Sequence, residues 1–187
     1  MNPYGPCLGY RATSTNGYAT PFVYSSYGET VAQVESLAAG MEKLKLVDAN
    51  EDGMLLLGIY MRNNPEWLLS EHAVYCLGGS TVPLYDTLGP DVVRFVLEHT
   101  GLSCVACTRK ELDSLCNAKK TGSVERFKVV ILVDGVTAEA EQMAKSVGLD
   151  VLSLAKVGAV GAQIVGNGEF IANPPEPEDV ATFCYTR

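Results

Sequence analysis

The sequence is poor in positive charge and in histidine. It has 14 lysines and arginines against 22 aspartates and glutamates, which gives a formal net charge of −8, and only 2 histidines among 187 residues. Recognition of nucleic acid requires clustered cations that neutralise phosphates. The basic pairs at 109–110 and 119–120 are short, so we interpret them as solvated surface and expect no nucleic-acid partner.

Long hydrophobic runs are also missing. The longest extends only from Met54 to Met61, whereas a membrane-spanning helix needs roughly 20 apolar residues. Residues 1–10 lack the basic start and the apolar centre of a secretory signal. At 47% hydrophobic and 19% charged residues, the composition suits a folded domain with a core. We therefore expect a soluble domain on the cytosolic side of membranes, with any membrane attachment made by segments outside this chain.

The sequence has one CxxC motif, Cys104-Val105-Ala106-Cys107, and no second one. A zinc site would need two more ligands, and both histidines are isolated. A redox motif would begin a helix, whereas this one lies in a strand pattern, in which positions three apart point to opposite faces. Two buried structural thiols in a reducing compartment are the favoured interpretation, with the zinc and redox sites as its alternatives.

No Walker or dinucleotide fingerprint occurs in the sequence. The glycines at 158, 161, 166 and 168 resemble phosphate loops only faintly, because no strand precedes and no helix follows them at the right spacing. His72 and His99 have no partner acid or nucleophile at motif spacing, and we expect His99 to interact with a helix C-terminus. Glu66 and Glu71 are interpreted as helix acids. We therefore predict neither a catalytic residue nor a metal ligand in this chain.

What the sequence does contain is a regular alternation of strands and helices. Ser26 and Glu29 have the spacing of a capping box, and Asn64-Pro65-Glu66 combines a cap residue, a first-turn proline and a first-turn acid. The apolar patterns predict strands at 54–60, 81–85, 103–108, 128–133, 150–154 and 179–186, and helices at 27–45, 64–77, 89–100, 110–117 and 137–147. This order predicts an α/β fold with a mostly parallel sheet and helices on both faces.

The remaining segments are predicted as irregular. Residues 1–25 form a lead-in rich in Gly, Pro, Ser, Thr and Tyr, residues 117–123 form a polar loop, and residues 155–178 carry no confident pattern. The strand at 179–186 ends at Thr186. Ligands of parallel α/β sheets bind beyond the carboxyl ends of strands, so we expect functional residues to come after Thr186, where the chain stops at Arg187.

The most specific feature is the string Val82-Pro83-Leu84-Tyr85-Asp86-Thr87-Leu88-Gly89-Pro90. It runs from an apolar strand through a turn at Asp86-Thr87 into a helix start at Gly89-Pro90. None of its residues is an evident acid, base or nucleophile. Tyr85 and Asp86 stand at a strand's carboxyl end and could line a ligand cleft, but we favour a packed tyrosine and a turn aspartate.

This string resembles the long-chain fatty acid–CoA ligases (long-chain acyl-CoA synthetases) of the AMP-forming, adenylate-forming superfamily almost letter for letter. The motif Gly5-Pro6-Cys7-Leu8-Gly9-Tyr10-Arg11 and the motif Asn64-Pro65-Glu66-Trp67 are similar to further motifs of that family. In the second motif Asn63 matches the family's Asn and Asn64 replaces its Arg. Pro177-Glu178-Asp179, followed by Phe183-Cys184-Tyr185-Thr186, resembles the strand that leads into the family's phosphate loop.

The resemblance implies activation of a fatty acid with Mg-ATP, followed by transfer of the acyl group to coenzyme A, with AMP and pyrophosphate released. It implies a partial AMP-binding domain at 26–187 that is truncated at the start of the phosphate loop. Thr186 corresponds to the first position of that loop, and Arg187 stands where the family has Ser. The adenine-binding segment, the ribose-binding Asp and the lid Lys have no counterpart.

We therefore expect an N-terminal piece of the enzyme that is inactive alone. In the intact enzyme, fatty acid and CoA would be its substrates, with ATP and Mg as its cofactors, at the cytosolic face of the endoplasmic reticulum or another membrane. The alternatives are a non-catalytic α/β interaction module or truncated gene product, and an adenylate-forming ligase of another acid class.

Overall fold

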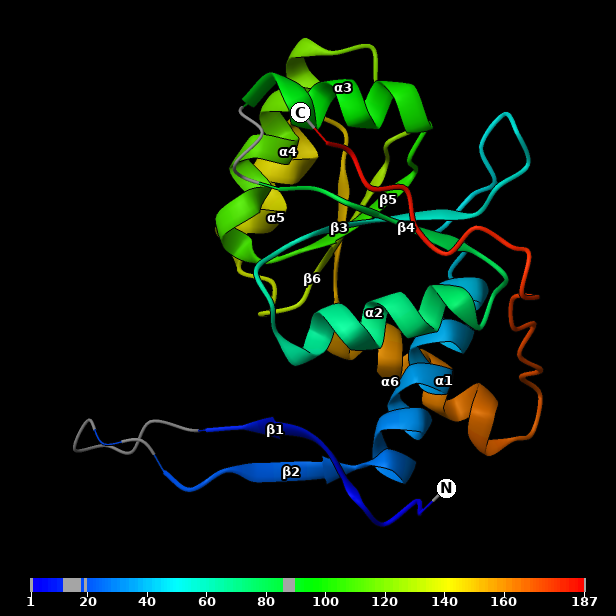
Figure 1. Ribbon diagram of the computed structural model, residues 1–187. Helices are drawn as coiled ribbons and strands as arrows, with labels where there is room; N and C mark the ends of the chain where they lie inside the picture. Colours follow the sequence, from blue (N-terminus) through cyan, green and yellow to red (C-terminus); the bar gives the residue numbers. More distant parts are fainter. Residues whose placement is uncertain (1, 12–17, 19, 86–89, 187) are drawn as a thin grey trace.

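The described part of the computed structural model comprises residues 2–11, 18, 20–85 and 90–186. Its helices and strands alternate after an N-terminal pair of strands (Figure 1). In chain order they are β1 (Pro6–Tyr10), β2 (Val23–Ser26), α1 (Tyr27–Lys43), β3 (Leu56–Tyr60), α2 (Pro65–Tyr75), β4 (Ser80–Pro83), α3 (Pro90–Thr100), β5 (Cys104–Cys107), α4 (Arg109–Thr121), β6 (Val129–Leu132), α5 (Ala138–Ser146), β7 (Asp150–Ser153) and α6 (Leu154–Gly166).

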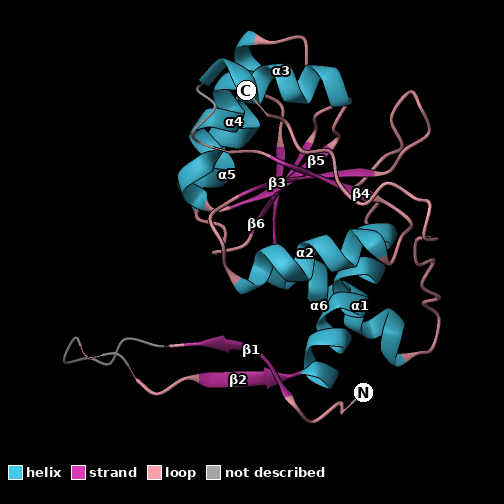
Figure 2. Cartoon of the chain, in the orientation of Figure 1, coloured by secondary structure: helices cyan, strands magenta, loops and turns pink. Residues whose placement is uncertain are grey.

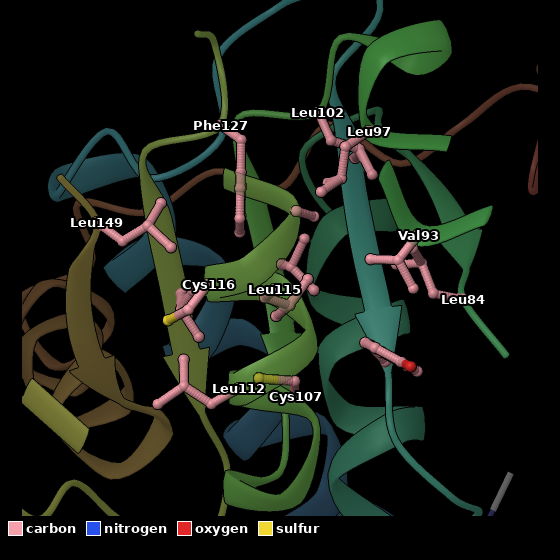
Figure 3. Packing of buried hydrophobic residues seen from close by; sticks show 14 of the residues in the cluster. Leu84, Val93, Leu97, Leu102, Cys107, Leu112, Leu115, Cys116, Phe127 and Leu149 are labelled. Carbon is pink, nitrogen blue, oxygen red and sulfur yellow. The ribbon is translucent and has the colours of Figure 1, made fainter. Parts of the chain in front are cut away.

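Strands β3 to β7 form one parallel sheet in the order β4-β3-β5-β6-β7. Helices α3, α4 and α5 cover one face, where they contribute to one hydrophobic cluster with β-strand residues such as Val105 and Val130. Helices α1, α2 and α6 cover the other face around Leu57 and Ile131. The layers are visible in Figure 2, and the first cluster in Figure 3. The predicted α/β class, parallel sheet and helices on both faces are confirmed.

The predicted helix starts are confirmed in detail. The side chain of Ser26 accepts from the backbone N–H of Glu29, and the Glu29 carboxylate accepts from the backbone N–H of Ser26 at 2.7 Å. The side chain of Asn64 accepts from the backbone N–H of Trp67 at 2.8 Å. Each cap satisfies helix N–H groups that have no partner within the helix.

The irregular lead-in predicted for residues 1–25 is wrong at two places. Strands β1 and β2 pair antiparallel, and the ring of Tyr24 lies across Gly9, its register partner. An aromatic side chain packed over a cross-strand glycine stabilises a pair that turn-forming composition alone disfavours. Ser26 ends β2 and also caps α1, so the hairpin leads directly into the helix. The domain boundary at residue 26 stays a prediction.

Helix α4 continues through most of the segment predicted as a polar loop at 117–123. Nζ of Lys119, in its last turn, donates to the carbonyl oxygens of Val124 at 2.9 Å and Phe127 at 2.6 Å. These bonds tie the helix end to the chain that leads into β6. A bond from a side chain to the carbonyl oxygens of the following loop leaves no periodic pattern in the sequence.

Together with residue 154, predicted as the end of a strand, residues 155–166, to which the sequence assigned no confident structure, form helix α6 (Leu154–Gly166). Its glycines do not form a phosphate loop. Gly161 instead packs so tightly against α1 that a Cβ atom there would collide with the carbonyl oxygen of Ser36 and the backbone nitrogen of Gly40. Glycine at this position permits close approach of two helix backbones.

The strand predicted at 179–186 is only a single parallel bridge, between Thr81 and Thr182. The segment lies beside β4, the edge strand of the sheet (Figure 1). The backbone N–H of Thr81 donates to Ala181 at 3.0 Å, and that of Phe183 donates to Thr81 at 2.9 Å. Residues beyond Phe183 turn towards α3, where Tyr185 contacts His99 and Phe95, so a regular ladder is not formed.

Candidate functional site

A cleft opens where β3 and β4 end, at the edge at which parallel α/β sheets bind ligands. Its volume is about 490 Å³. Three segments line it: the chain from the end of β3 into α2, the two residues after β4, and the first turn of α4. The described lining residues are Tyr60, Met61, Arg62, Asn63, Trp67, Leu84, Tyr85 and Glu111.

The N-terminus of α2 points its partial positive charge toward this region. Asn64 caps the helix and Pro65 occupies its first turn, so the local sequence fixes the helix start close to the cleft residues Asn63 and Trp67. The guanidinium of Arg62, which is exposed, adds a full positive charge. A helix N-terminus and a cation at one rim favour an anionic or strongly polar ligand group.

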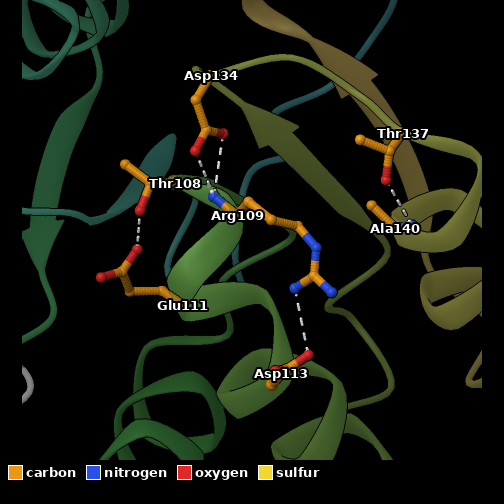
Figure 4. A network of polar contacts seen from close by, with 7 residues as sticks. All are labelled: Thr108, Arg109, Glu111, Asp113, Asp134, Thr137 and Ala140. Atoms are coloured by element: carbon orange, nitrogen blue, oxygen red, sulfur yellow. Dashed lines mark hydrogen bonds and ion pairs between the residues drawn. The ribbon is translucent and has the colours of Figure 1, made fainter.

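Glu111 is a buried acid in the cleft wall, with 4% of its surface exposed. The hydroxyl of Thr108 donates to its Oε2 atom (Figure 4). Nζ of Lys110 lies 3.7 Å from its Oε1 atom. Its place in the first turn of α4 also brings it near the positive end of that helix. The carboxylate can therefore accept a hydrogen bond from a ligand N–H or O–H group in the cleft.

Our sequence reasoning missed Glu111. The available pattern was Thr108-x-x-Glu111 directly after a strand, which is the spacing of a capping box at a strand's carboxyl end. The Thr108 side chain makes no bond to the helix backbone, because its hydroxyl is directed to the glutamate instead.

Asp134 joins the two loops next to the cleft. It follows β6, and its carboxylate accepts from the backbone N–H of Arg109 at 2.9 and 3.0 Å, which caps α4 from a neighbouring loop (Figure 4). Nη1 of Arg109 lies 3.3 Å from Oδ1 of Asp113. Exposed ion pairs of this kind contribute little stability, so the cap made by Asp134 is the contact that positions the first turn of α4.

Tyr85 lines the cleft, contrary to our preference for a packed tyrosine. Burial raises the pKa of its hydroxyl, and the neighbouring Cys184 thiol raises it further. The C-terminal segment therefore passes beside a residue of the cleft wall. Of the string from Val82 to Pro90, the turn at 86–89 lies outside the described residues, and α3 begins at Pro90 as predicted.

Thr186 is exposed and is not among the described residues that line the cleft. It follows Tyr185, whose hydroxyl lies 2.6 Å from Nδ1 of His99. The sequence suggested an interaction of His99 with a helix C-terminus. The structure places His99 in the last turn of α3 and also in contact with the C-terminal segment. Arg187 lies outside the described residues.

The CxxC cysteines are fully buried on opposite faces of the sheet, as predicted from their spacing. Cys104 belongs to the cluster under α1, α2 and α6, and Cys107 to the cluster under α3, α4 and α5 (Figure 3). Burial raises the pKa of both thiols, which opposes the thiolate that redox chemistry and metal binding need.

The other candidate residues are engaged in local helix contacts. Nδ1 of His72 lies 3.0 Å from the carbonyl oxygen of Leu68 on its own helix, and the Glu71 carboxylate accepts from the Tyr75 hydroxyl at 3.1 Å. Glu66 lies in the first turn of α2. Within residues 2–11, 18, 20–85 and 90–186, no three His, Cys, Asp or Glu side chains are grouped so that they could hold a metal ion. None of the described helices is long and apolar enough to cross a membrane.

Comparison with protein families gives a match over nearly the whole chain. The model of the family described as "AMP-binding enzyme" matches residues 12–186. Among curated proteins, the long chain acyl-CoA synthetase 7 (peroxisomal) of Arabidopsis thaliana is 30% identical over 96% of this chain. The long-chain-fatty-acid–CoA ligase 5 of Mus musculus is 31% identical over 97% of it. The chain covers 24% and 25% of these two proteins, so it spans about a quarter of their length.

Solved structures with the same fold are adenylation enzymes. The adenylation domain of a carboxylate reductase from Mycobacterium chelonae superposes with a TM-score of 0.70 at 18% identity, and covers 96% of this chain and 29% of that one. A long-chain-fatty-acid-CoA ligase from Archaeoglobus fulgidus gives a TM-score of 0.66 at 15% identity, over 95% and 31% of the two chains. At these identities the likeness establishes the fold.

Proposed function

Because the chain belongs to the AMP-binding enzyme family, we propose that it forms the N-terminal α/β subdomain of a long-chain fatty acid–CoA ligase. The intact enzyme would convert ATP, a fatty acid and CoA into acyl-CoA, AMP and pyrophosphate. The observation that carries the proposal is the agreement of the family match with curated relatives that are named as long-chain acyl-CoA synthetases or ligases.

Within that enzyme, this subdomain would mainly position other groups. The cleft at the ends of β3 and β4 would form one wall of the site, with Arg62 and the N-terminus of α2 facing anionic groups and Glu111 accepting from a donor. Thr186 would be the first residue of the ATP phosphate loop. The described residues supply no acid cluster that fits Mg²⁺, so we assign none of them a role in holding the metal.

The test compares the 187-residue chain with the product of its transcript read past the codon of Arg187. We expect Ser-Gly-Thr-Thr-Gly-like codons there, and ATP-dependent formation of palmitoyl-CoA and AMP only by the longer product. Turnover by the short chain would refute its inactivity. Activity on acetate or benzoate but not on palmitate would indicate a ligase of another acid class.

A second candidate, a non-catalytic interaction module, is favoured by the surface of the β1–β2 hairpin. Tyr10, Phe22 and Tyr24 each expose at least half of their surface, and Arg11 lies 4.1 Å above the ring of Phe22. Within the part of the chain that the structure describes, the two strands pair only with each other, so each leaves one edge unpaired. Such edges and exposed aromatic side chains promote association between chains.

This candidate predicts that the purified chain self-associates. Light scattering at increasing concentration should show a dimer that is lost in Phe22→Ser. Ile171→Ser, which removes a side chain that is 87% exposed outside the hairpin, is the matched control and should leave association unchanged. A stop codon directly after Arg187, together with such a dimer, would favour the module over the ligase, whereas a monomer at all concentrations would count against it.

A further inference from the structure

The C-terminal segment is attached to the sheet over a very short length. The hydroxyl of Ser80 donates to the backbone carbonyl oxygen of Val180 at 2.5 Å, and the hydroxyl of Thr182 donates to the backbone carbonyl oxygen of Thr81 at 3.2 Å. With the two backbone bonds between Thr81 and residues 181 and 183, these hydrogen bonds to the sheet all involve two neighbouring residues of β4, Ser80 and Thr81. One bridge by itself leaves the direction of the following residues poorly fixed.

A second attachment lies two residues further along the chain, on α3. Besides its hydrogen bond to His99, the ring of Tyr185 stands edge-on to two aromatic rings. It makes an interplanar angle of 81° with His99 at 5.8 Å and of 88° with Phe95 at 6.1 Å. Phe95 and His99 stack on each other at 5.4 Å and 13°. Edge-to-face pairs in this distance range are favourable.

The two attachment points belong to consecutive elements. Phe95 and His99 are four residues apart on α3 and therefore share one face of the helix. Helix α3 is also the helix that follows β4, which holds Thr182. The same strand-loop-helix unit therefore fixes the segment at residue 182 and again at residue 185, which determines the direction in which the chain reaches Thr186.

We propose that His99 and Phe95 are positioning residues, which hold Tyr185 and thereby place the start of the ATP phosphate loop against the end of the sheet. The inference rests on the proposed function for the role of Thr186, but the clamp itself rests on the contacts of Tyr185. We name the set Phe95, His99 and Tyr185 the aromatic clamp.

The first arm of the test uses the 187-residue chain and amide hydrogen exchange. The amide of Phe183 reports docking of the segment, and the amide of Ser80, which donates to Leu55 at 2.8 Å, reports the β3–β4 pair. His99→Phe and Tyr185→Phe keep the rings and remove the hydrogen bond. Each should speed exchange at Phe183 about fivefold, equivalent to roughly 1 kcal/mol for one hydrogen bond, while exchange at Ser80 is unchanged.

A double variant and a matched control make this arm specific. His99→Phe with Tyr185→Phe should exchange no faster than either single variant, because both remove the same bond. His72→Phe alters the other histidine, which also lies near a tyrosine ring, Tyr75 at 5.8 Å on its own helix, and should have no effect at Phe183. Additive effects of the two single variants, or no effect, would overturn the clamp.

The second arm uses the intact enzyme. His99→Phe should raise the KM for ATP about fivefold and leave the KM for the fatty acid unchanged, since only placement of the phosphate loop is disturbed. Equal changes in both constants, or none in the KM for ATP, would overturn the positioning role. If the intact protein shows no ATP-dependent activity at all, the proposed function fails, and the exchange arm still decides whether the clamp exists.

Discussion

Replacing Gly161 with alanine should destabilise the folded chain by about 3 kcal/mol, the upper part of the range for overpacking a tight interior. A Cβ atom there would meet backbone atoms of Ser36 and Gly40 on α1. Backbone cannot change rotamer to make room, so α6 must move away from α1 as a whole. Urea unfolding followed by circular dichroism measures the loss as a lower midpoint.

The matched control is Gly158→Ala on the same helix. A Cβ atom at Gly158 would meet only Cδ2 of Leu37, at 3.6 Å, which is ordinary van der Waals contact. Alanine is better than glycine in a helix interior by up to about 1 kcal/mol, so this variant should be neutral or more stable. Equal effects at both positions would contradict the packing of α6 against α1 described above.

The second large effect is a loss of stability at alkaline pH. Burial raises the pKa of Cys104 and Cys107 above the ordinary value of 9.0. Between pH 9 and the raised pKa values of the folded state, the unfolded chain releases the thiol protons and the folded chain keeps them. The contribution of the two thiols to stability is therefore fully present below pH 9 and is lost as the pH rises above 9. Linkage gives each thiol a limiting slope of about 1.4 kcal/mol per pH unit well above pH 9. Between pH 9 and 10 the unfolded thiol is only partly ionised, so each thiol accounts for about 1 kcal/mol and the pair for about 2 kcal/mol.

Urea unfolding at a series of pH values measures this slope. In the double variant Cys104→Ala with Cys107→Ala, the loss of unfolding free energy between pH 9 and 10 should be smaller by about 2 kcal/mol, whatever the stability at neutral pH. Cys184→Ala removes an exposed thiol and should keep the original slope. A double variant with the unchanged slope would show that the two thiols are not buried, and would reopen the redox and zinc alternatives.

The parts of the fold that the sequence predicts correctly are those encoded locally. Strand β3 is a continuous apolar run. Ser26 and Asn64 are N-cap residues whose side chains bond to backbone N–H groups three residues later. Strand ends differ by one or two residues from the pattern, because the sheet pairs only where a neighbour is present. The spacing of Cys104 and Cys107 was also sufficient to place them on opposite faces.

The parts that sequence reasoning missed depend on contacts between distant residues. By composition the glycines of α6 indicate a loop. They form a helix instead, in which Gly161 lets the backbone of α6 pack directly against the backbone of α1. Glu111 was not distinguished from the neighbouring solvated charges, although its carboxyl is buried beside Thr108. The pairing of Tyr185 with His99 joins residues 86 positions apart, and no local rule anticipates it.

The edge contact of β4 has a consequence for the order in which the chain assembles. The three neighbouring strand pairs made by single crossovers join residues 21 to 25 positions apart, whereas Ser80 and Val180 are separated by 100. Each doubling of a closed loop adds about 0.6 kcal/mol of entropy cost, so the edge contact costs about 1.2 kcal/mol more to close. It cannot form before Val180 has emerged from the ribosome, by which time the parallel core can already exist. Among the described elements we therefore expect residues 180–186 to dock last, onto a surface that is already folded, where the aromatic clamp would hold them.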